Sequence, residues 1–344
     1  MKITISNQIQ PGTDSFVASH PLAAEGHRPA WLDVLSRGLG HRVMSITAQR
    51  DGQVVGYLPL AISRGMCFGS HAVSLPFLSQ AGPLADQPET RHALIDQAIQ
   101  AARATGAQRI EIRETDTQYE HHAMHASRSD KIGMLRSMPG SADDLWASFN
   151  PKVRNQIRKA ERNGVTIRRG GSELINPFYR LFTTNMRDLG TPVYARRFFE
   201  AMLHHLESDA ELFVAEHEGQ IAAASILVHR PGASFVPVAS SLRTFNHTCA
   251  NMLIYWHMMQ RAIERGSGSF DFGRSTIDSG PHRFKKQWGA QPQTLNWRHA
   301  QLSGNADPVS REDPKYSRAV RLWQRLPIWA TRIIGPPIAR RIPA

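Results

Sequence analysis

The chain has 344 residues, of which 41% are hydrophobic and 20% charged, and its formal net charge is +12. This is the composition of a globular protein with room for two ordinary domains, and it excludes wholesale disorder. The positive charge favours encounters with anions, among them nucleic acid, nucleotide-linked sugars and anionic lipid, without choosing between them.

Two cysteines, Cys67 and Cys249, are too few and too far apart for a disulfide framework or a zinc-binding CxxC pair. The first seven residues lack the apolar core of a signal peptide. No apolar run approaches the roughly 18 residues needed to span a bilayer. We therefore expect a cytoplasmic protein, with peripheral contact at the inner face of the plasma membrane.

The first predicted elements are a hairpin, a helix and a strand. Strand-like residues 43–47 lead into Asp51-Gly52, a pair typical of a tight turn, and a second apolar strand follows. A helix is predicted over 89–105, with Gly106 as its C-terminal stop. The strand 109–113 comes next.

A polar stretch over residues 115–130 is predicted to be a disordered loop. It holds His121, His122 and His125. Because the sequence shows no ordered carboxylate or cysteine partner for them, we expect no metal site.

The segment 141–164 is predicted to be helical and to link two domains. Ser141 suits a helix cap, and Pro151 and Gly164 suit the first turn and the end of a second helix. On that helix Arg154, Arg158 and Arg162 recur every four residues and share one face, with Lys159 beside them. Such a row fits phosphates on RNA or on a lipid or nucleotide carrier, or else a solvated face.

The elements after residue 165 repeat the earlier order. A strand ending at Val214, a turn at Glu218-Gly219 and a second apolar strand match the first hairpin. A helix over 248–265 stops at Gly266, and the strand 269–273 follows. Two matches in the same order and spacing indicate an internal duplication. The fold class expected is α/β, with mixed sheets in two tandem domains.

The predicted domains are 1–140, a link over 141–164, a second domain over 165–302 that carries the reaction site, and a tail over 303–344. The tail carries lysine and arginine with tryptophan and isoleucine, and no acidic residue follows Asp313. This composition fits a helix on an anionic membrane or one docked on protein. We expect the tail to dock on the first domain, with its basic edge toward lipid.

Four ordered pieces of the chain resemble one known family: the basic helix around Arg154–Ala160, the segment Asn251–Trp256, the segment Phe270–Ser275 and the segment Phe284–Gly289. Together with the tail they resemble the Fem family of peptidyl and aminoacyl transferases, in particular the branch associated with exosortase (PEP-CTERM) and exopolysaccharide systems. The resemblance covers about residues 30–340. It implies two acetyltransferase-like (GNAT) domains, which agrees with the duplication.

The resemblance also implies site residues. The family's lysine at the reacting end of the donor maps to Lys285, which would stabilise a developing oxyanion, and Phe284 would stack on the donor's terminal adenine. Asp271, at the end of its strand, is a candidate general base or a turn-capping carboxylate. The candidate substrate-binding residues are completed by Lys286, Arg274, Ser275, Asn251, Arg154, Arg158 and Lys159.

Acyl transfer onto an amine or hydroxyl of a cell-envelope or exopolysaccharide precursor is therefore the expected function, with aminoacyl-tRNA or acyl-CoA as donor and no other cofactor. Residues 242–251 contain no glycine, unlike the loop that holds the CoA pyrophosphate in ordinary acetyltransferases. Two alternatives stay open: an acetyl-CoA-dependent acetyltransferase of a polysaccharide intermediate, and a non-catalytic scaffold that binds RNA or membrane.

Overall fold

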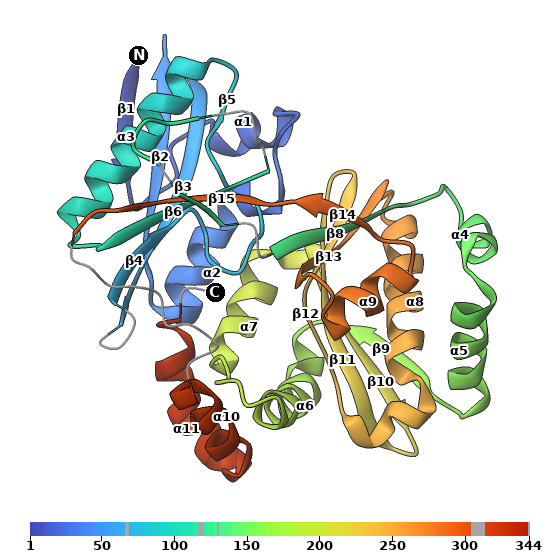
Figure 1. Cartoon of the computed structure of the whole chain (residues 1–344). Coiled ribbons are helices and arrows are strands. Elements are labelled where there is room, and N and C mark those ends of the chain that lie inside the picture. The colour runs from blue at the N-terminus through green and yellow to red at the C-terminus, as the bar shows by residue number, and fades with distance from the viewer. Residues whose placement is uncertain (66–68, 116–119, 125, 129–130, 304–313, 343–344) are drawn as a thin grey trace. The chain divides into compact units, whose positions relative to one another are not determined.

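The computed structural model describes residues 1–65, 69–115, 120–124, 126–128, 131–303 and 314–342. The chain forms two compact units. The first comprises 1–131, 294–310 and 337–344, and the second comprises 132–293 and 311–336. Each unit is built on a mixed sheet with helices packed against it, which confirms the predicted α/β class (Figure 1).

The sheet of the first unit has the order β1-β2-β3-β4-β6-β15-β7, and β5 pairs with β3. Along β3, Leu58 and Leu60 belong to the core that includes α3, whereas Tyr57 packs with Val17 of α1, as strand alternation requires. The elements are β1 (Lys2–Ser6), α1 (Thr13–Ser19), α2 (Ala30–Leu39), β2 (Arg42–Arg50), β3 (Gln53–Gly65), β4 (Gly69–Val73), β5 (Leu84–Ala85), α3 (Pro88–Ala104), β6 (Arg109–Glu114), β7 (Ala126–Arg128) and β15 (Asn296–Gln301).

The sheet of the second unit has the order β14-β8-β13-β12-β11-β10-β9. Helix α8, with α5 packed on it, covers one face, and α6 and α7 cover the other (Figure 1). The elements are β8 (Lys131–Ser137), α4 (Ala142–Ser148), α5 (Pro151–Arg162), β9 (Thr166–Gly170), α6 (Ile175–Asp188), α7 (Arg196–His205), β10 (Ala210–His217), β11 (Gln220–Arg230), β12 (Ala233–Ser241), α8 (Ala250–Glu264), β13 (Ser269–Thr276), α9 (Gly280–Gln287), β14 (Gln291–Thr294), α10 (Pro314–Gln324) and α11 (Ile328–Ala339).

The hairpins β2–β3 and β10–β11 share their turn and their irregularity. Both turns have positive φ at both central residues, 51° and 79° at Asp51-Gly52 and 51° and 72° at Glu218-Gly219, which is the type I′ geometry that suits a two-residue hairpin. In each hairpin the ladder slips three residues before the turn, directly after Ala48 and directly after Ala215. A bulge at the same offset in both hairpins supports the predicted duplication.

The crossover that follows each hairpin is also shared. In the first unit α3 connects to β6, which pairs in parallel with β4, and in the second unit α8 connects to β13, which pairs in parallel with β12. Parallel neighbours need such a crossover connection. Both helices stop before a glycine in the left-handed region, Gly106 at 74° and Gly266 at 72°.

The domain boundaries differ from the predicted ones. Residues 294–310 belong to the first unit, because β15 pairs along its whole length with β6 and Trp297 donates its indole N–H to the Ser79 carbonyl at 2.9 Å. The second unit starts at residue 132, since β8 belongs to its sheet. The segment 141–164 is part of the second unit as well, with Val153, Ile157 and Ala160 buried in its core.

The tail docks differently from the prediction. Helix α10 packs against α6, and Gln324 donates to the Asp188 carbonyl at 3.0 Å. On α11 the Arg332 guanidinium donates to Thr183 Oγ1 at 2.9 and 3.1 Å. Docking on the first domain is therefore wrong for residues 314–336, which lie in the second unit. Only the last described residues join the first unit, where His41 Nε2 contacts the Arg340 carbonyl at 2.8 Å.

The histidine-rich stretch is more ordered than predicted where the structure describes it. Residues 126–128 form β7, and His121 Nε2 lies 3.4 Å from Asp96 Oδ1, a carboxylate neighbour that the sequence did not reveal. His121 Nδ1 accepts the Ala123 N–H at 3.2 Å, which leaves Nε2 as the ring nitrogen on the Asp96 side. Asp96, His121 and His122 each place a possible metal-ligand atom within 4.8 Å of the others, so the structure supplies the carboxylate partner whose absence was the reason to expect no metal site. His125 lies outside the described residues.

Candidate functional site

The candidate site is built around Lys285 on α9. Ser279 caps this helix by accepting the His282 N–H at 3.3 Å, and Pro281 stands in its first turn. The next turn carries Lys285 inward, and only 8% of the residue is exposed. Its Nζ donates to the carbonyl oxygens of Gly273 at 3.0 Å and Arg274 at 2.8 Å, both on β13.

Asp271 and Gly273 of β13 lie beside the Lys285 ammonium and complete this part of the site. Gly273 has φ 71°, in the left-handed region that favours glycine, and its N–H donates to Asp271 Oδ1 at 2.7 Å. Asp271 is also the last residue of β13 in register with β12, opposite Phe235. The β12–β13 register thus ends at Asp271, two residues before Gly273, whose N–H and carbonyl contact the carboxylate and the lysine.

Burial shifts both ionisable groups toward neutral pH. Desolvation raises the pKa of Asp271 to about 6, against the opposing effects of the Gly273 N–H and of Lys285. Desolvation lowers the pKa of Lys285 to about 8, while Asp271 raises it and Arg274 lowers it further. At pH 7 the carboxylate is mostly ionised and the amine mostly protonated, and each is poised to exchange a proton.

Ser275 and Arg274 continue β13 beside this part of the site. The Ser275 hydroxyl is buried and makes no hydrogen bond within the described protein atoms. A buried hydroxyl without a protein partner is uncommon and marks a place for water or a ligand. Arg274 supplies a carbonyl to Lys285, and its charge acts on the lysine pKa.

Phe284 belongs to an aromatic cluster beside Lys285. Its ring meets Tyr255 edge to face with centroids 5.1 Å apart, and Tyr255 stacks on Phe272 at 5.5 Å. Phe284 remains partly exposed, whereas Tyr255 is buried and burial raises the pKa of its phenol. Tyr255 was missed as a site-forming residue; its position one helical turn after Asn251 was the available signal.

A buried arginine, which the sequence analysis did not identify, contacts the C-terminal end of α9. Arg136 of β8 donates to the Trp288 carbonyl at the end of α9 and to Ser148 Oγ at 2.5 Å. Its guanidinium lies over the Phe149 ring at 4.9 Å. These contacts fix the C-terminal end of α9, which carries the exposed Lys286.

The remaining predicted binding residues lie on other elements. Arg154, Arg158 and Lys159 are on α5, which packs against α8. Arg158 and Lys159 are exposed and Arg154 is half-buried, and the Arg158 guanidinium lies 5.3 Å from the Trp146 ring centroid. Asn251 stands in the first turn of α8, where the amide of Ala250 is already paired with Thr248 Oγ1 at 3.2 Å.

Asp278, Ser279 and His282 are of the residue types found in hydrolase triads, but two of their side chains make turn contacts instead. Ser279 Oγ donates to the Thr276 carbonyl at 2.6 Å, and His282 Nδ1 accepts the Asp278 N–H at 3.0 Å. Both side chains are used to shape the turn before α9, so they are capping groups.

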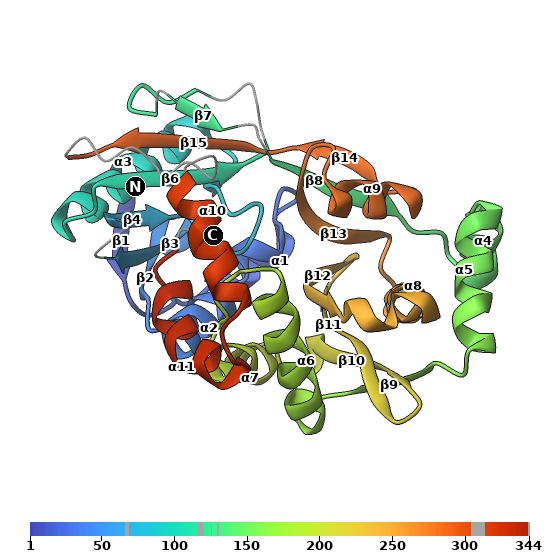
Figure 2. The same cartoon turned by 60° about the horizontal axis from the view of Figure 1, so that its bottom comes forward.

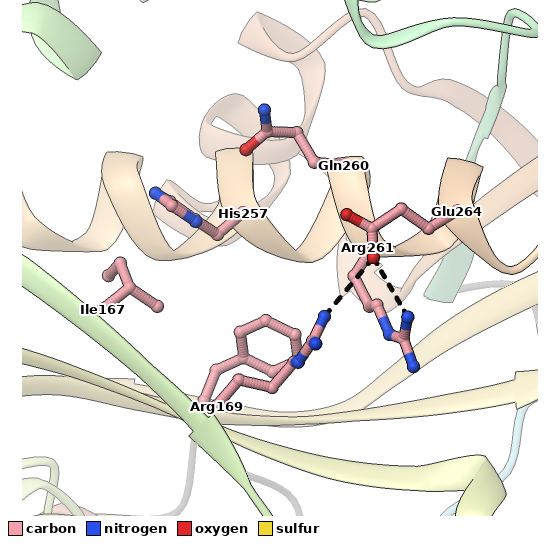
Figure 3. A pocket seen from close by; sticks show the side chains of 7 residues that line it. Ile167, Arg169, His257, Gln260, Arg261 and Glu264 are labelled. Carbon is pink, nitrogen blue, oxygen red and sulfur yellow. Dashed lines mark hydrogen bonds and ion pairs between the residues drawn. The ribbon is translucent and has the colours of Figure 1, made fainter.

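A separate pocket of about 340 Å³ lies between α8 and the strands β9 and β10. Figure 3 shows the Glu264 carboxylate of α8 next to the guanidinium groups of Arg169 and Arg261, with His257 and Gln260 farther along α8. Arg261 binds Glu211 at 2.6 Å and Glu264 at 3.0 Å, and Glu264 also pairs with Arg169 at 3.4 Å. Because its guanidinium groups are compensated by carboxylates, we assign this pocket a structural role.

Comparison with known proteins agrees with this architecture. Residues 147–286 match the family model described as an acetyltransferase (GNAT) domain. The chain is 25% identical over 244 residues to a lipid II:glycine glycyltransferase of Staphylococcus aureus. The alignment covers 62% of this chain and 55% of the relative. The chain thus spans about half the length of the curated relatives it matches.

Solved structures show the same fold over nearly the whole chain. The crystal structure of FemX matches with a TM-score of 0.70 and 18% identity, over 94% of this chain and all of that one. A tandem GNAT protein from the clavulanic acid biosynthesis pathway matches with a TM-score of 0.57 and 11% identity, over 89% of this chain and all of that one.

The fold and the domain match define the class: the chain has a tandem GNAT architecture, similar in fold to FemX, with an acetyltransferase (GNAT) domain match over residues 147–286. The recognition made from the sequence is confirmed at this level. The particular relatives, the glycyltransferase and FemX, are proteins to which the chain is similar.

Proposed function

We propose that the protein transfers an aminoacyl or acyl group to an amine or hydroxyl of a cell-envelope precursor, with Lys285 and Asp271 as the reacting groups. The observation that carries this proposal is that a buried amine and a half-buried, desolvated carboxyl both contact the backbone of Gly273 in the matched GNAT domain. The glycyltransferase relative supports an aminoacyl donor and an envelope acceptor.

In the proposed reaction the acceptor amine or hydroxyl attacks the activated carbonyl carbon of the donor directly. Asp271 takes the proton from the attacking atom, and the carbonyl oxygen becomes an oxyanion in the tetrahedral intermediate. As the intermediate collapses, the bond to the leaving oxygen or sulfur breaks, and the proton returns to that leaving atom. No covalent bond to the protein is formed.

Lys285 is proposed to stabilise the oxyanion. An ammonium has three N–H donors, and two of those on Lys285 are used by the carbonyls of Gly273 and Arg274. The third is assigned to the oxyanion. Since the two carbonyl bonds hold the ammonium before the donor arrives, little reorganisation is needed at the moment of reaction.

Aminoacyl-tRNA is the proposed donor, and the exposed cations of α5 are proposed to contact its phosphates. Phe284, Arg274, Ser275, Lys286 and Asn251 are proposed to complete the donor and acceptor contacts. An acyl-CoA donor is the second candidate, favoured by the GNAT domain match. It is disfavoured by the glycine-free segment before α8, where the Ala250 amide already has a partner.

An exopolysaccharide intermediate is the proposed acceptor, as in the family branch that the sequence resembles. We place the reaction in the cytoplasm at the inner face of the plasma membrane. Among the described residues, no helix is both long and apolar enough to cross a bilayer, so this contact would be peripheral.

Mass spectrometry of the envelope polymers, with and without the protein, tests the function. In cells that lack the protein, we expect one substituent mass to be missing from the polymers. Wild-type protein should restore that mass, and the Lys285→Met variant should not. The mass itself identifies the transferred group. If the polymers are unchanged in the absence of the protein while RNA or vesicle binding persists, the chain is a scaffold and the proposed chemistry is wrong.

A further inference from the structure

We propose that the outer surface of the α10–α11 pair is a docking site for an anionic lipid bilayer. This tail surface consists of Arg318, Arg321, Leu322 and Arg325 on α10 and Trp329 and Ile333 on α11. Three of the largest exposed apolar side chains of the described chain belong to it: Leu322 and Trp329 are 67% exposed and Ile333 is 65% exposed. Large apolar groups gathered on a surface mark an interaction site.

On α10 the residues that face the protein and those that face outward are distinct. Trp323 is 9% exposed, and Val320 packs so closely on Gly190 that a Cβ atom at position 190 would collide with the valine side chain. Arg318, Arg321 and Arg325 recur at spacings of three and four residues, on the opposite side of the helix from this contact. Leu322 lies at the edge of that basic stripe.

On α11 the same division holds, with apolar residues outward. Thr331 is fully buried and Arg332 binds Thr183 of α6, so these residues mark the protein side. Trp329 and Ile333 are four residues apart and share the other side. Ile334, at 43% exposed, flanks them. Figure 2 shows α10 and α11 as neighbouring helices. We infer that the basic stripe of one and the apolar stripe of the other, each on the side away from the protein contacts, form one surface.

The positive charge of the tail favours an anionic bilayer as the partner of the tail surface. From Lys315 to Arg341 the sequence contains six arginines, one lysine and no acidic residue. Interfacial helices combine arginine with tryptophan and isoleucine in this way, because the apolar groups enter the acyl boundary while the guanidinium groups bind anionic headgroups. A second copy of the chain fits less well, since symmetric pairing would bring like-charged arginine stripes together.

This inference does not depend on the proposed chemistry. Vesicle binding requires neither a donor nor Lys285, so its failure and the failure of acyl transfer are observed separately. If both hold, the tail surface brings the site to lipid-carried precursors.

Co-sedimentation of the full chain with vesicles tests the proposal. Binding is expected to phosphatidylcholine vesicles containing phosphatidylglycerol and to be much weaker with phosphatidylcholine alone. The double variant Trp329→Ala/Ile333→Ala is expected to bind at least about tenfold more weakly, because it removes most of the apolar area available for insertion. Replacing Arg318, Arg321 and Arg325 by glutamine is expected to weaken binding by about fivefold for each arginine that lies at the membrane.

A matched control is Leu22→Ala, which truncates an apolar residue of the first unit that is 62% exposed and should leave binding unchanged. Brominated lipid is expected to quench tryptophan fluorescence in the wild type. In Trp329→Leu the quenching should be largely lost while binding is retained. Undiminished binding by the Trp329/Ile333 double variant would overturn the proposal. So would a wild-type dimer that the double variant converts to a monomer while neither form binds vesicles.

Discussion

The ammonium of Lys285 donates to the carbonyl oxygen of Gly273 at 3.0 Å, while the N–H of the same glycine donates to Asp271 Oδ1 at 2.7 Å. One residue in a left-handed conformation therefore sets the positions of both proposed reacting groups. Any change in the conformation of Gly273 moves the base and the cation together.

The variant Gly273→Ala is expected to lose activity with only a moderate loss of stability. A Cβ would meet its nearest neighbour, the Val236 carbonyl oxygen, at 3.5 Å, an ordinary contact, so the cost comes from the φ of 71°. That strain is about 1–2 kcal/mol of unfolding free energy, and misplacement of the reacting groups can lower kcat by up to about a hundredfold.

The control for that variant is Gly219→Ala. Gly219 has φ 72° and an open environment, but lies in the β10–β11 turn. Denaturant unfolding should give both variants a similar stability loss, and kinetics should separate them. Equal kcat values for the two would show that Gly273 matters for folding alone.

Lys285→Met is expected to lower kcat by about 10²–10³-fold, the usual cost of removing one oxyanion donor. The substitution also leaves the Gly273 and Arg274 carbonyls without the ammonium, which costs about 1–3 kcal/mol of stability. Single-turnover kinetics on folded protein, checked by circular dichroism, measures the first effect. Lys2→Met, at an exposed lysine of β1, is the charge-matched control.

The pH dependence of kcat is expected to be bell-shaped. Asp271 must be ionised to accept a proton, so activity falls as the pH drops through its pKa of about 6. Lys285 must be protonated to stabilise the oxyanion, so activity falls as the pH rises through its pKa of about 8. A rate profile that is flat across this window would contradict both assignments.

Asp271→Asn is expected to remove the acidic limb of that profile and to lower the maximum rate. The alkaline limb should move to lower pH, because the carboxylate normally raises the pKa of Lys285. Lys285→Arg should move the alkaline limb out of range, since a guanidinium stays charged. An acidic limb that persists in Asp271→Asn would assign the base to another group.

Replacing Arg154, Arg158 and Lys159 together by glutamine is expected to weaken tRNA binding and to flatten its salt dependence. Each lost phosphate contact should reduce the slope of log K against log salt by about 0.7. Fluorescence anisotropy over a salt series measures this. Arg168→Gln, at an exposed arginine of β9 already paired with Glu216, is the control. An unchanged slope would favour an acyl-CoA donor.

The sequence by itself determined the local elements and their duplication. The Asp51-Gly52 and Glu218-Gly219 turns and the helix stops at Gly106 and Gly266 follow from backbone preferences over a few residues. The β13–α9 segment, which holds both proposed reacting groups, was singled out by its resemblance to the Fem family.

Only the tertiary structure decided which strands join which sheet, and which groups are buried together. A strand pairs with any compatible edge whatever the length of chain between, so β15 pairs with β6 although the sequence places it after the second domain. The tail lies on α6 because Val320 packs on Gly190 and Arg332 donates a hydrogen bond to Thr183. The shifted pKa values of Asp271 and Lys285 arise from shared desolvation, a property of the packed interior that no residue carries alone.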